Sequence, residues 1–335
     1  MHYKHEPHTF TLPQELIAIS PSNPRDSSRL MSIDSRTGAL SHHIFRDLPS
    51  LLTAGDVLVF NDSAVFPARL IGRKPTGGKV EILLLHRLPD GNWKYISRPG
   101  FKSGHKVIIS PDFWANIIDS EILKLSSNDE KLITKYGHTP LPPYIPDSAP
   151  EKILRRRYQT VYARNKGSAA APTAGLHFTP RLLSLLKNNG IELEFLTLHV
   201  GLGTFKPPTV QQIAEGRLHS EQFLLKKDTA RRLSQAKSSG RRIIAVGTTT
   251  TRVLETLSST SGNLSPDSGQ TDIFIKSPYR FKFVDGLITN FHLPGSSLLM
   301  LVSAFASSDI ISRAYQTAIK RNYRFYSFGD AMLII

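Results

Sequence analysis

The sequence predicts a layered α/β domain that is interrupted by a small β-barrel. Helices and buried strands alternate through the C-terminal half of the chain, and short strands separated by glycine turns occupy residues 64–112. At 335 residues the chain is long enough for two domains. We therefore expect a discontinuous α/β domain of residues 1–62 and 156–335, with an inserted β-barrel domain at residues 63–155.

The inserted barrel is predicted from short strands of similar spacing. The expected strands are Val65–Leu70, Lys79–Leu85, Asn92–Ser97 and Lys106–Ile109. Glycine-containing turns separate them, which is typical of a meander or barrel. Five prolines between Pro140 and Pro150 then predict a stiff segment that returns the chain to the α/β domain.

The elements of the α/β domain are predicted from caps and hydrophobic periodicity. Thr179 can cap a helix with Pro180 in its first turn, and Gly190 suits the left-handed residue that follows the helix. Strands are expected at 191–200, 242–246 and 287–292, and further helices at 228–239, 251–257, 296–306 and 309–321. We expect Asp228 and Asp309 to cap two of these helices.

The chain is strongly basic. It has 42 lysines and arginines against 27 acidic residues, which gives a formal net charge of +15. Such an excess favours a polyanionic partner, because phosphates that are neutralised release their counterions. The alternative is a basic surface that only aids solubility.

The residue types and motifs that the sequence lacks exclude several kinds of site. The chain contains no cysteine, which excludes disulfides, thiolate nucleophiles and cysteine-ligated zinc or iron–sulfur clusters. It has no HExxH motif or comparable ligand cluster, so we expect no metal. The N-terminus lacks the apolar core of a signal peptide, and the longest apolar stretch, residues 298–306, is too short to span a bilayer. We expect a monomeric, cytoplasmic protein with no membrane partner.

The most informative stretch is residues 170–205, where polar turns lie at both ends of a helix and a strand. His177 follows Gly175 directly before a helix start, where backbone amides favour negative charge, and Thr173 lies in the same turn. Capping would require only Thr179. We therefore favour a functional role for His177 over a packing role.

His199 lies at the end of the next predicted strand. The turn glycines Gly201 and Gly203 follow it, and ligands bind at the carboxyl ends of strands in α/β folds. A hydrogen-bonded core histidine is the alternative. These glycines do not form a dinucleotide fingerprint, because the third glycine and a capped helix are missing.

Two later segments also combine polar side chains. His219 and Glu221 can act together in an extended segment, although an ordinary surface pair is the alternative. Thr248 and Thr249 belong to a run of four threonines that turns from a strand into a helix. Together with Arg252 they could hold a carboxylate or a ribose hydroxyl; the alternative is a helix cap with surplus threonines.

Polar residues recur near the C-terminus. Asn290 and His292 end another predicted strand. Residues 323–330 alternate aromatic side chains with Arg324 and end on Asp330, a pattern that fits base stacking or a terminal edge strand. The strand ends together predict a single cleft that contains His177, His199, Thr248 and His292.

Taken in order, these segments resemble the S-adenosylmethionine:tRNA ribosyltransferase-isomerases of queuosine biosynthesis. The resemblance runs nearly from end to end. It includes LPQELIA, GDVLVFNDS, GGKVEILLL, LPPYIP, AAPTAGLHFT, TLHVGLGTF, HSE, VGTTTTR, TNFHLP and YSFGDAM. Each segment is short, but a series in the same order is specific to one family.

The resemblance implies a reaction on transfer RNA. Enzymes of this family move the ribosyl part of S-adenosylmethionine onto the aminomethyl group of a 7-deazaguanine at the wobble position, and they release adenine and methionine. S-adenosylmethionine is then a co-substrate, and no permanently bound cofactor or metal is implied. The family fold, an α/β domain with an inserted β-barrel, agrees with the prediction from the residues.

The resemblance also suggests catalytic residues. A sulfonium acidifies the neighbouring 5′ C–H, and histidine is a base of suitable strength for removing that proton. We expect His177 and His199 to form the leading acid–base pair, with His219 and Glu221 as further catalytic residues. The sequence does not divide the roles among the histidines.

Substrate contacts are expected at several further residues. Ribose hydroxyls need acceptors, and Glu221, Asp272 or Asp330 could supply them. The methionine carboxylate suits the threonine-rich helix start with Arg252. We expect the anticodon stem to meet Arg155, Arg156 and Arg157.

Five positions depart from the family pattern, and two other functions stay open. Ala64 replaces a usual arginine, Gly216 a histidine, Gly295 a lysine, and Thr250-Thr251 a Ser-Val pair. An S-adenosylmethionine-dependent RNA methyltransferase would need a glycine-rich loop and a ribose-binding acid, which are not found. A non-catalytic RNA-binding protein would not need polar clusters at several strand ends.

Overall fold

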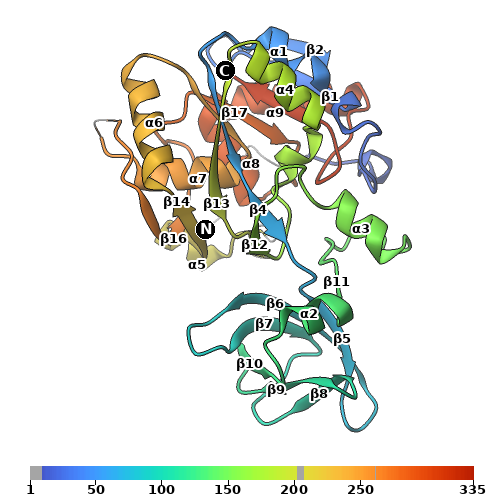
Figure 1. The fold of residues 1–335 in the computed structure, drawn as a ribbon. Helices are drawn as coiled ribbons and strands as arrows, with labels where there is room; N and C mark the ends of the chain where they lie inside the picture. Colours follow the sequence, from blue (N-terminus) through green and yellow to red (C-terminus); the bar gives the residue numbers. More distant parts are fainter. Residues whose placement is uncertain (1–9, 202–206, 261) are drawn as a thin grey trace.

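The structure is a computed structural model that describes residues 10–201, 207–260 and 262–335. Figure 1 shows a large body of sheet and helices, and a smaller sheet set apart from it. The chain enters the smaller sheet after residue 65 and returns to the large body before residue 165. The mixed α/β class is therefore as predicted.

The large sheet is mixed, with a parallel centre. In the described residues it has nine strands, in spatial order β16 (Asp267–Ile273), β14 (Arg217–Leu225), β13 (Glu192–Leu198), β3 (Val57–Asn61), β15 (Ile243–Val246), β17 (Gly286–Asn290), β18 (Ala331–Ile334), β1 (Arg29–Ile33) and β2 (Leu40–Ile44). β13, β3, β15 and β17 run parallel to one another. Their carboxyl ends consequently meet at one edge of the sheet.

The helices follow most of the predicted periodicity. Within the described part of the chain the α-helices are α1 (Leu48–Leu51), α2 (Glu130–Tyr136), α3 (Glu151–Arg157), α4 (Pro180–Asn188), α5 (Val210–Glu215), α6 (Lys227–Ser238), α7 (Thr248–Leu257), α8 (Ser297–Ala306) and α9 (Ser308–Lys320). A short 3-10 helix, η4 (Thr173–His177), precedes α4. The side chain of Thr179 accepts a hydrogen bond from the Leu182 backbone N–H, so the predicted cap of α4 is confirmed.

Two predicted caps are wrong. The N-cap residue of α6 is Lys226, which makes no side-chain cap, and Asp228 lies inside the first turn. The Ser307 hydroxyl caps α9 by accepting from the Ile310 backbone N–H at 3.4 Å, so Asp309 also lies in the first turn. A carboxylate there still favours the helix, because it faces the positive end of the helix dipole.

The sheet separates two apolar cores. Successive side chains of a strand point to opposite faces, so Val57 and Val59 pack into one core and Leu58 and Phe60 into the other. The first core holds buried residues of α6, α7, α8 and α9, and the second holds those of α1 and α4. Covering both faces forces the parallel strands to be apolar, which fits the continuous hydrophobic run IIAV of β15.

Of the two alternatives for residues 323–330, the terminal edge strand is wrong. The strand begins only after this segment, as β18, and it lies inside the sheet between β17 and β1. Asp330 is buried and accepts the backbone N–H groups of Arg29 and Arg324 at 2.9 and 2.8 Å. Its carboxylate therefore fixes the entry to β18.

The smaller sheet contains the predicted short strands. Its described order is β11 (Gly137–His138), β5 (Arg69–Arg73), β6 (Lys79–Arg87), β7 (Trp93–Arg98), β10 (Ile122–Leu125), β9 (Phe113–Ile117) and β8 (Lys106–Ser110), and β5 also pairs with β8. The strand predicted at 65–70 is instead divided between β5 and β4 (Ser63–Val65). β4 pairs with β12 (Asn165–Ser168) outside this sheet. The sheet encloses a core of its own, which includes Leu70, Ile82 and Phe113.

No single helix of the described residues is long and apolar enough to cross a membrane. α8 and α9 reach the length and composition of a span only when taken together, and they meet at a bend of 114°. Both helices contribute buried residues to the first core.

Candidate active site

The carboxyl ends of the central parallel strands carry a polar network. Asn61 ends β3, and its Nδ2 donates to the Leu198 carbonyl at 2.9 Å and to Thr249 Oγ1 at 3.3 Å. Its Oδ1 accepts the backbone N–H of Leu198 at 3.0 Å and of Ser63 at 3.1 Å. The Asn61 side chain therefore connects the carboxyl ends of β3 and β13 with the first turn of α7.

Asp62 adds a buried carboxylate to this edge. Its Oδ1 accepts Thr197 Oγ1 at 2.7 Å and Asn165 Nδ2 at 3.0 Å, and Asn165 Nδ2 also reaches Thr197 Oγ1 at 2.9 Å. Its side chain is 7% exposed. The carboxylate is thus held at a fixed place directly after β3.

His199 lies next to this carboxylate at the end of β13. Burial lowers the pKa of His199, and the charge of Asp62 works in the opposite direction. The imidazole ring packs on Gly167, where an added Cβ would come within 2.9 Å of Nδ1. Nδ1 is buried and has no hydrogen-bond partner among the described residues. A neutral imidazole can act as a general base, and because Nδ1 is buried the nitrogen left for that role is Nε2.

His199 opens onto a cavity of about 410 Å³ between the large body and the smaller sheet. We call it the Trp93 cavity. Its walls include Phe66, Trp93 and Glu130 near the smaller sheet, and Lys166, His199 and Gln222 from the large body. This volume lies in the range of pockets that bind small organic ligands.

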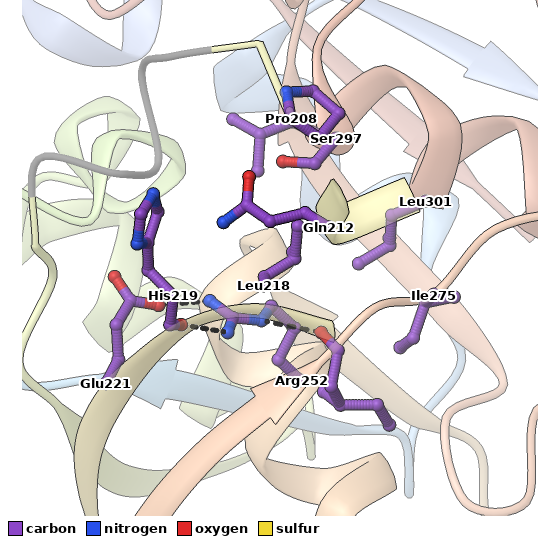
Figure 2. Close-up of a pocket in the computed structure, with 11 residues that line it drawn as sticks. Pro208, Gln212, Leu218, His219, Glu221, Arg252, Ile275, Ser297 and Leu301 are labelled. Atoms are coloured by element: carbon purple, nitrogen blue, oxygen red, sulfur yellow. Dashed lines mark hydrogen bonds and ion pairs between the residues drawn. The ribbon is translucent and has the colours of Figure 1, made fainter. Parts of the chain in front are cut away.

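A second, much smaller cavity lies beside β14, between α7 and α8, and is lined by Glu221, Arg252 and His219 (Figure 2). Arg252 Nη1 forms a buried ion pair with Glu221, and the Arg252 guanidinium also donates to the carbonyls of Thr271 and Ile273, both at 3.3 Å. The remaining space, about 20 Å³, holds no more than a water-sized group. In this arrangement the Arg252 guanidinium is already paired with the Glu221 carboxylate.

His219 and Glu221 line the same cavity beside β14 (Figure 2), and His219 is exposed whereas Glu221 is buried. The next residue of the strand, Gln222, lines the Trp93 cavity instead. The Gln222 carbonyl accepts the His199 backbone N–H at 2.9 Å. The His219–Glu221 pair and His199 therefore serve two different cavities.

His177 lies in the interior. Its Nδ1 is 2.7 Å from the Ser28 hydroxyl, and its ring stacks on Phe45 with the centroids 4.8 Å apart. Burial lowers the pKa of His177 to about 3, so the imidazole is neutral. The structure places it among core aromatic rings and does not place it in the Trp93 cavity with His199.

His292 and Asn290 are also buried. Burial lowers the pKa of His292 to about 3, and its Nε2 is 2.8 Å from Thr289 Oγ1. Asn290 Nδ2 donates to the Tyr326 carbonyl at 2.9 Å, which holds the loop before β18. Both side chains have internal partners.

The threonine run is the first turn of α7 and does not cap it. The N-cap residue is Gly247, at φ 95°, and the helix begins at Thr248. Thr250 and Thr251 use their hydroxyls on the carbonyls of Val246 and Gly247, at 2.9 and 3.3 Å. Thr249 Oγ1 accepts from Asn61, as described above.

The predicted turn glycines have local structural roles. Gly175 is buried where an added Cβ would meet the Tyr162 hydroxyl at 1.9 Å, so only glycine fits there. The Gly201 backbone N–H donates to Glu221 Oε1 at 2.8 Å. Thr173 begins η4 and is partly buried. Gly203 lies outside the described residues.

The two further candidate carboxylates are separated from the Trp93 cavity. Asp272 is on β16 and forms a 3.5 Å ion pair with Arg217. Asp330 is committed to the backbone before β18, as described above.

The three consecutive arginines of α3 divide into two kinds. Arg155 donates to Glu151 at 2.8 Å and to the carbonyls of Thr134 and Gly137 at 2.9 and 2.8 Å, so it joins α3 to the end of α2. The side chains of Arg156 and Arg157 are exposed and line a basic hollow with Arg25. These two remain candidates for contact with phosphate.

Several site residues were not predicted. Asp62 directly follows a buried strand. The rule that ligands bind at the carboxyl ends of strands, which predicted His199, would therefore also have predicted Asp62. Trp93, Phe66 and Gln222 had no such signal, because only the contact between the two sheets brings them to one cavity. Among residues 10–201, 207–260 and 262–335, no group of three or more metal-ligating side chains is placed to hold a metal ion.

A histidine, a buried carboxylate and a cavity at the carboxyl edge of parallel strands are features typical of α/β enzymes that bind organic ligands. Comparison with known proteins specifies the class. The family model described as "Queuosine biosynthesis protein" matches residues 5–334. The chain belongs to this family.

Relatives of similar length support the same assignment. The chain is 49% identical over 333 residues to the S-adenosylmethionine:tRNA ribosyltransferase-isomerase of Thermotoga maritima, covering 97% of this chain and 98% of that protein. It is 48% identical over 347 residues to the protein of that name from Desulfitobacterium hafniense, covering 99% and 100%. It also resembles the crystal structure of S-adenosylmethionine tRNA ribosyltransferase from Thermotoga maritima, with a TM-score of 0.58, 40% identity, and coverage of 98% and 100%.

Proposed function

We propose that this protein transfers and isomerises the ribosyl moiety of S-adenosylmethionine onto the aminomethyl group of 7-aminomethyl-7-deazaguanine at the wobble position of tRNA. The products are epoxyqueuosine-tRNA, adenine and methionine. The observation that carries the proposal is the match to ribosyltransferase-isomerases over 97% of the chain. The Trp93 cavity beside His199 supports it, because the reaction needs a base next to a site for organic ligands.

His199 is the proposed base in this reaction. The sulfonium of S-adenosylmethionine acidifies the 5′ C–H, and a neutral imidazole accepts that proton. Burial lowers the pKa of His199, and the carboxylate charge of Asp62 opposes that shift, so Asp62 stabilises the imidazolium that results. The incoming amine must also lose a proton, and the departing adenine must gain one. His219 is the second proposed proton carrier; because it lines the smaller cavity and not the Trp93 cavity, this role requires a substrate that reaches from one cavity to the other.

The smaller sheet and the basic hollow receive the proposed tRNA. We propose that residues 63–155 are an inserted β-barrel domain. The pairing of Arg73 with Ile108, between β5 and β8, supports this proposal. Phosphates of the anticodon stem would contact Arg156 and Arg157. A tRNA substrate suits a cytoplasmic protein, and we propose that it acts as a monomer.

The decisive experiment supplies both substrates. The purified protein is incubated with S-adenosylmethionine and an anticodon stem-loop that carries the aminomethyl deazaguanine, and free adenine and RNA mass are measured. Adenine release with a ribosyl-derived mass gain is expected. S-adenosylhomocysteine instead of adenine would indicate a methyltransferase, and RNA binding without consumption of S-adenosylmethionine would indicate a non-catalytic binding protein.

A further inference from the structure

We propose that the Trp93 cavity receives the wobble base of the RNA substrate, turned out of the anticodon loop and stacked on Trp93. The inference rests on the proposed function and assigns the base to particular residues. It follows from the aromatic wall of the cavity, the polar groups that also line it and the second hollow that shares three residues with it.

The aromatic wall is built to hold a planar ring. Trp93 packs on Phe66 with ring centroids 5.7 Å apart, and Trp93 Nε1 donates to Asn128 Oδ1 at 3.3 Å. These contacts fix the indole plane, while the side chain stays partly exposed where it lines the cavity. Stacking on such a ring suits any nucleobase, because every base has a flat π face.

Other residues that line the cavity supply hydrogen-bonding groups. Gln222 and His199 project from neighbouring strands, and the backbone bond between these two residues holds the strands together. Glu130 and Lys166 bridge the cavity wall through a 3.0 Å ion pair between exposed side chains. Because exposed pairs are weak, this one can open to a base. A carboxylate then accepts the N–H donors of a guanine-type edge or of an aminomethyl group.

The surroundings favour an RNA base over the adenine of S-adenosylmethionine. A second hollow, lined by Arg87, Asn128 and Gln222 among others, shares these three residues with the Trp93 cavity. Together the two hollows form a path along the loop between β6 and β7. Such a path fits a polynucleotide strand with one base inserted and the rest of the strand continuing along the surface. Turning a base out of a loop costs less than removing it from a duplex.

The chain offers a direct optical test, because it contains only two tryptophans, Trp93 and Trp114. Trp114 is on β9, where Lys106 Nζ lies 4.2 Å from its ring centroid, and it does not line the cavity. Trp114→Phe leaves Trp93 as the reporter, and Trp93→Phe leaves Trp114 as the matched control. The ligands are the stem-loop with aminomethyl deazaguanine, the same stem-loop with an abasic wobble site, and S-adenosylmethionine alone.

Quenching of Trp93 by the base-containing stem-loop, and not by the abasic stem-loop or by S-adenosylmethionine, is the expected result. Trp114 should show no base-dependent change. Trp93→Ala should weaken stem-loop binding by roughly tenfold or more, and Trp93→Phe should retain most of the affinity because it keeps a ring. Quenching by S-adenosylmethionine alone would place adenine in the cavity and overturn the proposal, as would equal quenching by the abasic stem-loop.

Turnover by the wild-type protein separates this inference from the proposed function. Adenine release together with a Trp93 signal that does not depend on the base would contradict only the proposed base site and would leave the proposed function standing. Absence of both turnover and stem-loop binding would remove the proposed function and the base site with it.

Discussion

At the scale of single residues, the candidate histidines differ in what surrounds them. His177 and His292 are 4% and 8% exposed and have internal partners, whereas His199 faces a cavity large enough for a ligand. A buried imidazole whose pKa lies near 3 cannot take up a proton at neutral pH without losing its packing. Of these three, His199 alone has both an accessible setting and a nearby carboxylate.

Replacement of His199 and of His177 should therefore have different effects. His199→Ala should lower the rate of adenine release by roughly 10²–10⁴, because a positioned acid or base contributes that much. His177→Ala should mainly lower the free energy of unfolding, because it removes a ring that packs on Phe45. Adenine release and urea unfolding are measured on both variants. Unchanged turnover in His199→Ala would remove His199 from the chemistry.

At the scale of elements, β12 limits the position of the His199 ring, the proposed base. Gly167 of this strand has φ 139°, and the His199 ring occupies the space where a side chain would project. The network of Asn61 and Asp62 holds the same strand ends from the other side. Two positions where the sequence departs from the family pattern, Gly216 and Gly295, are left-handed glycines at φ 66° and 68°, and a Cβ added at either would meet no atom within 4 Å.

Gly167→Ala should displace the His199 ring. The added methyl would lie 2.9 Å from Nδ1, so we expect turnover to fall about a hundredfold, as misplacement of a reacting group by about 1 Å does. Gly77→Ala is the matched control, because Gly77 also has a positive φ, 93°, but no atom within 4 Å of the added carbon. Both variants carry backbone strain. Equal turnover in the two would contradict the role of Gly167.

At the scale of the whole molecule, charge and burial govern behaviour in solution. The net charge of +15 favours RNA, but the arginines of α3 do not contribute alike. Arg155 is engaged with backbone carbonyls, whereas Arg156 and Arg157 are exposed. Buried neutral histidines in turn couple folding to pH.

Charge reversal on α3 should weaken RNA binding in a salt-dependent way. Arg156→Glu with Arg157→Glu should reduce the slope of log affinity against log salt by about 0.9 for each phosphate that the protein no longer neutralises. Arg231→Glu, an exposed arginine of α6, is the control and should change the slope less. Stem-loop affinity is measured at salt concentrations from about 50 to about 200 mM. An identical slope for both proteins would rule out α3 as an RNA contact.

Stability should fall as the pH drops below about 6.5. The unfolded chain takes up protons on His177 and His292 near that pH, whereas the folded chain does so only near a pKa of about 3. Between about pH 7.5 and pH 5.5 each of these histidines should cost about 1.4 kcal/mol of unfolding free energy. His292→Gln should reduce that loss by the contribution of one histidine, and exposed His219→Gln should leave it unchanged. Urea unfolding at the two pH values tests this, and equal losses in all three proteins would contradict it.

The sequence by itself determined the family, the α/β class, the basic charge and most element positions. Those features depend on local periodicity, caps and ordered motifs, which the residues show directly. Only the tertiary structure decided that His199 lines a cavity whereas His177 packs on Phe45. It also decided that Glu221 pairs with Arg252 and that Trp93 lines the same cavity as His199. The physical reason is that burial and pairing come from contacts between residues far apart in the chain. No local pattern specifies which polar side chain keeps access to a ligand.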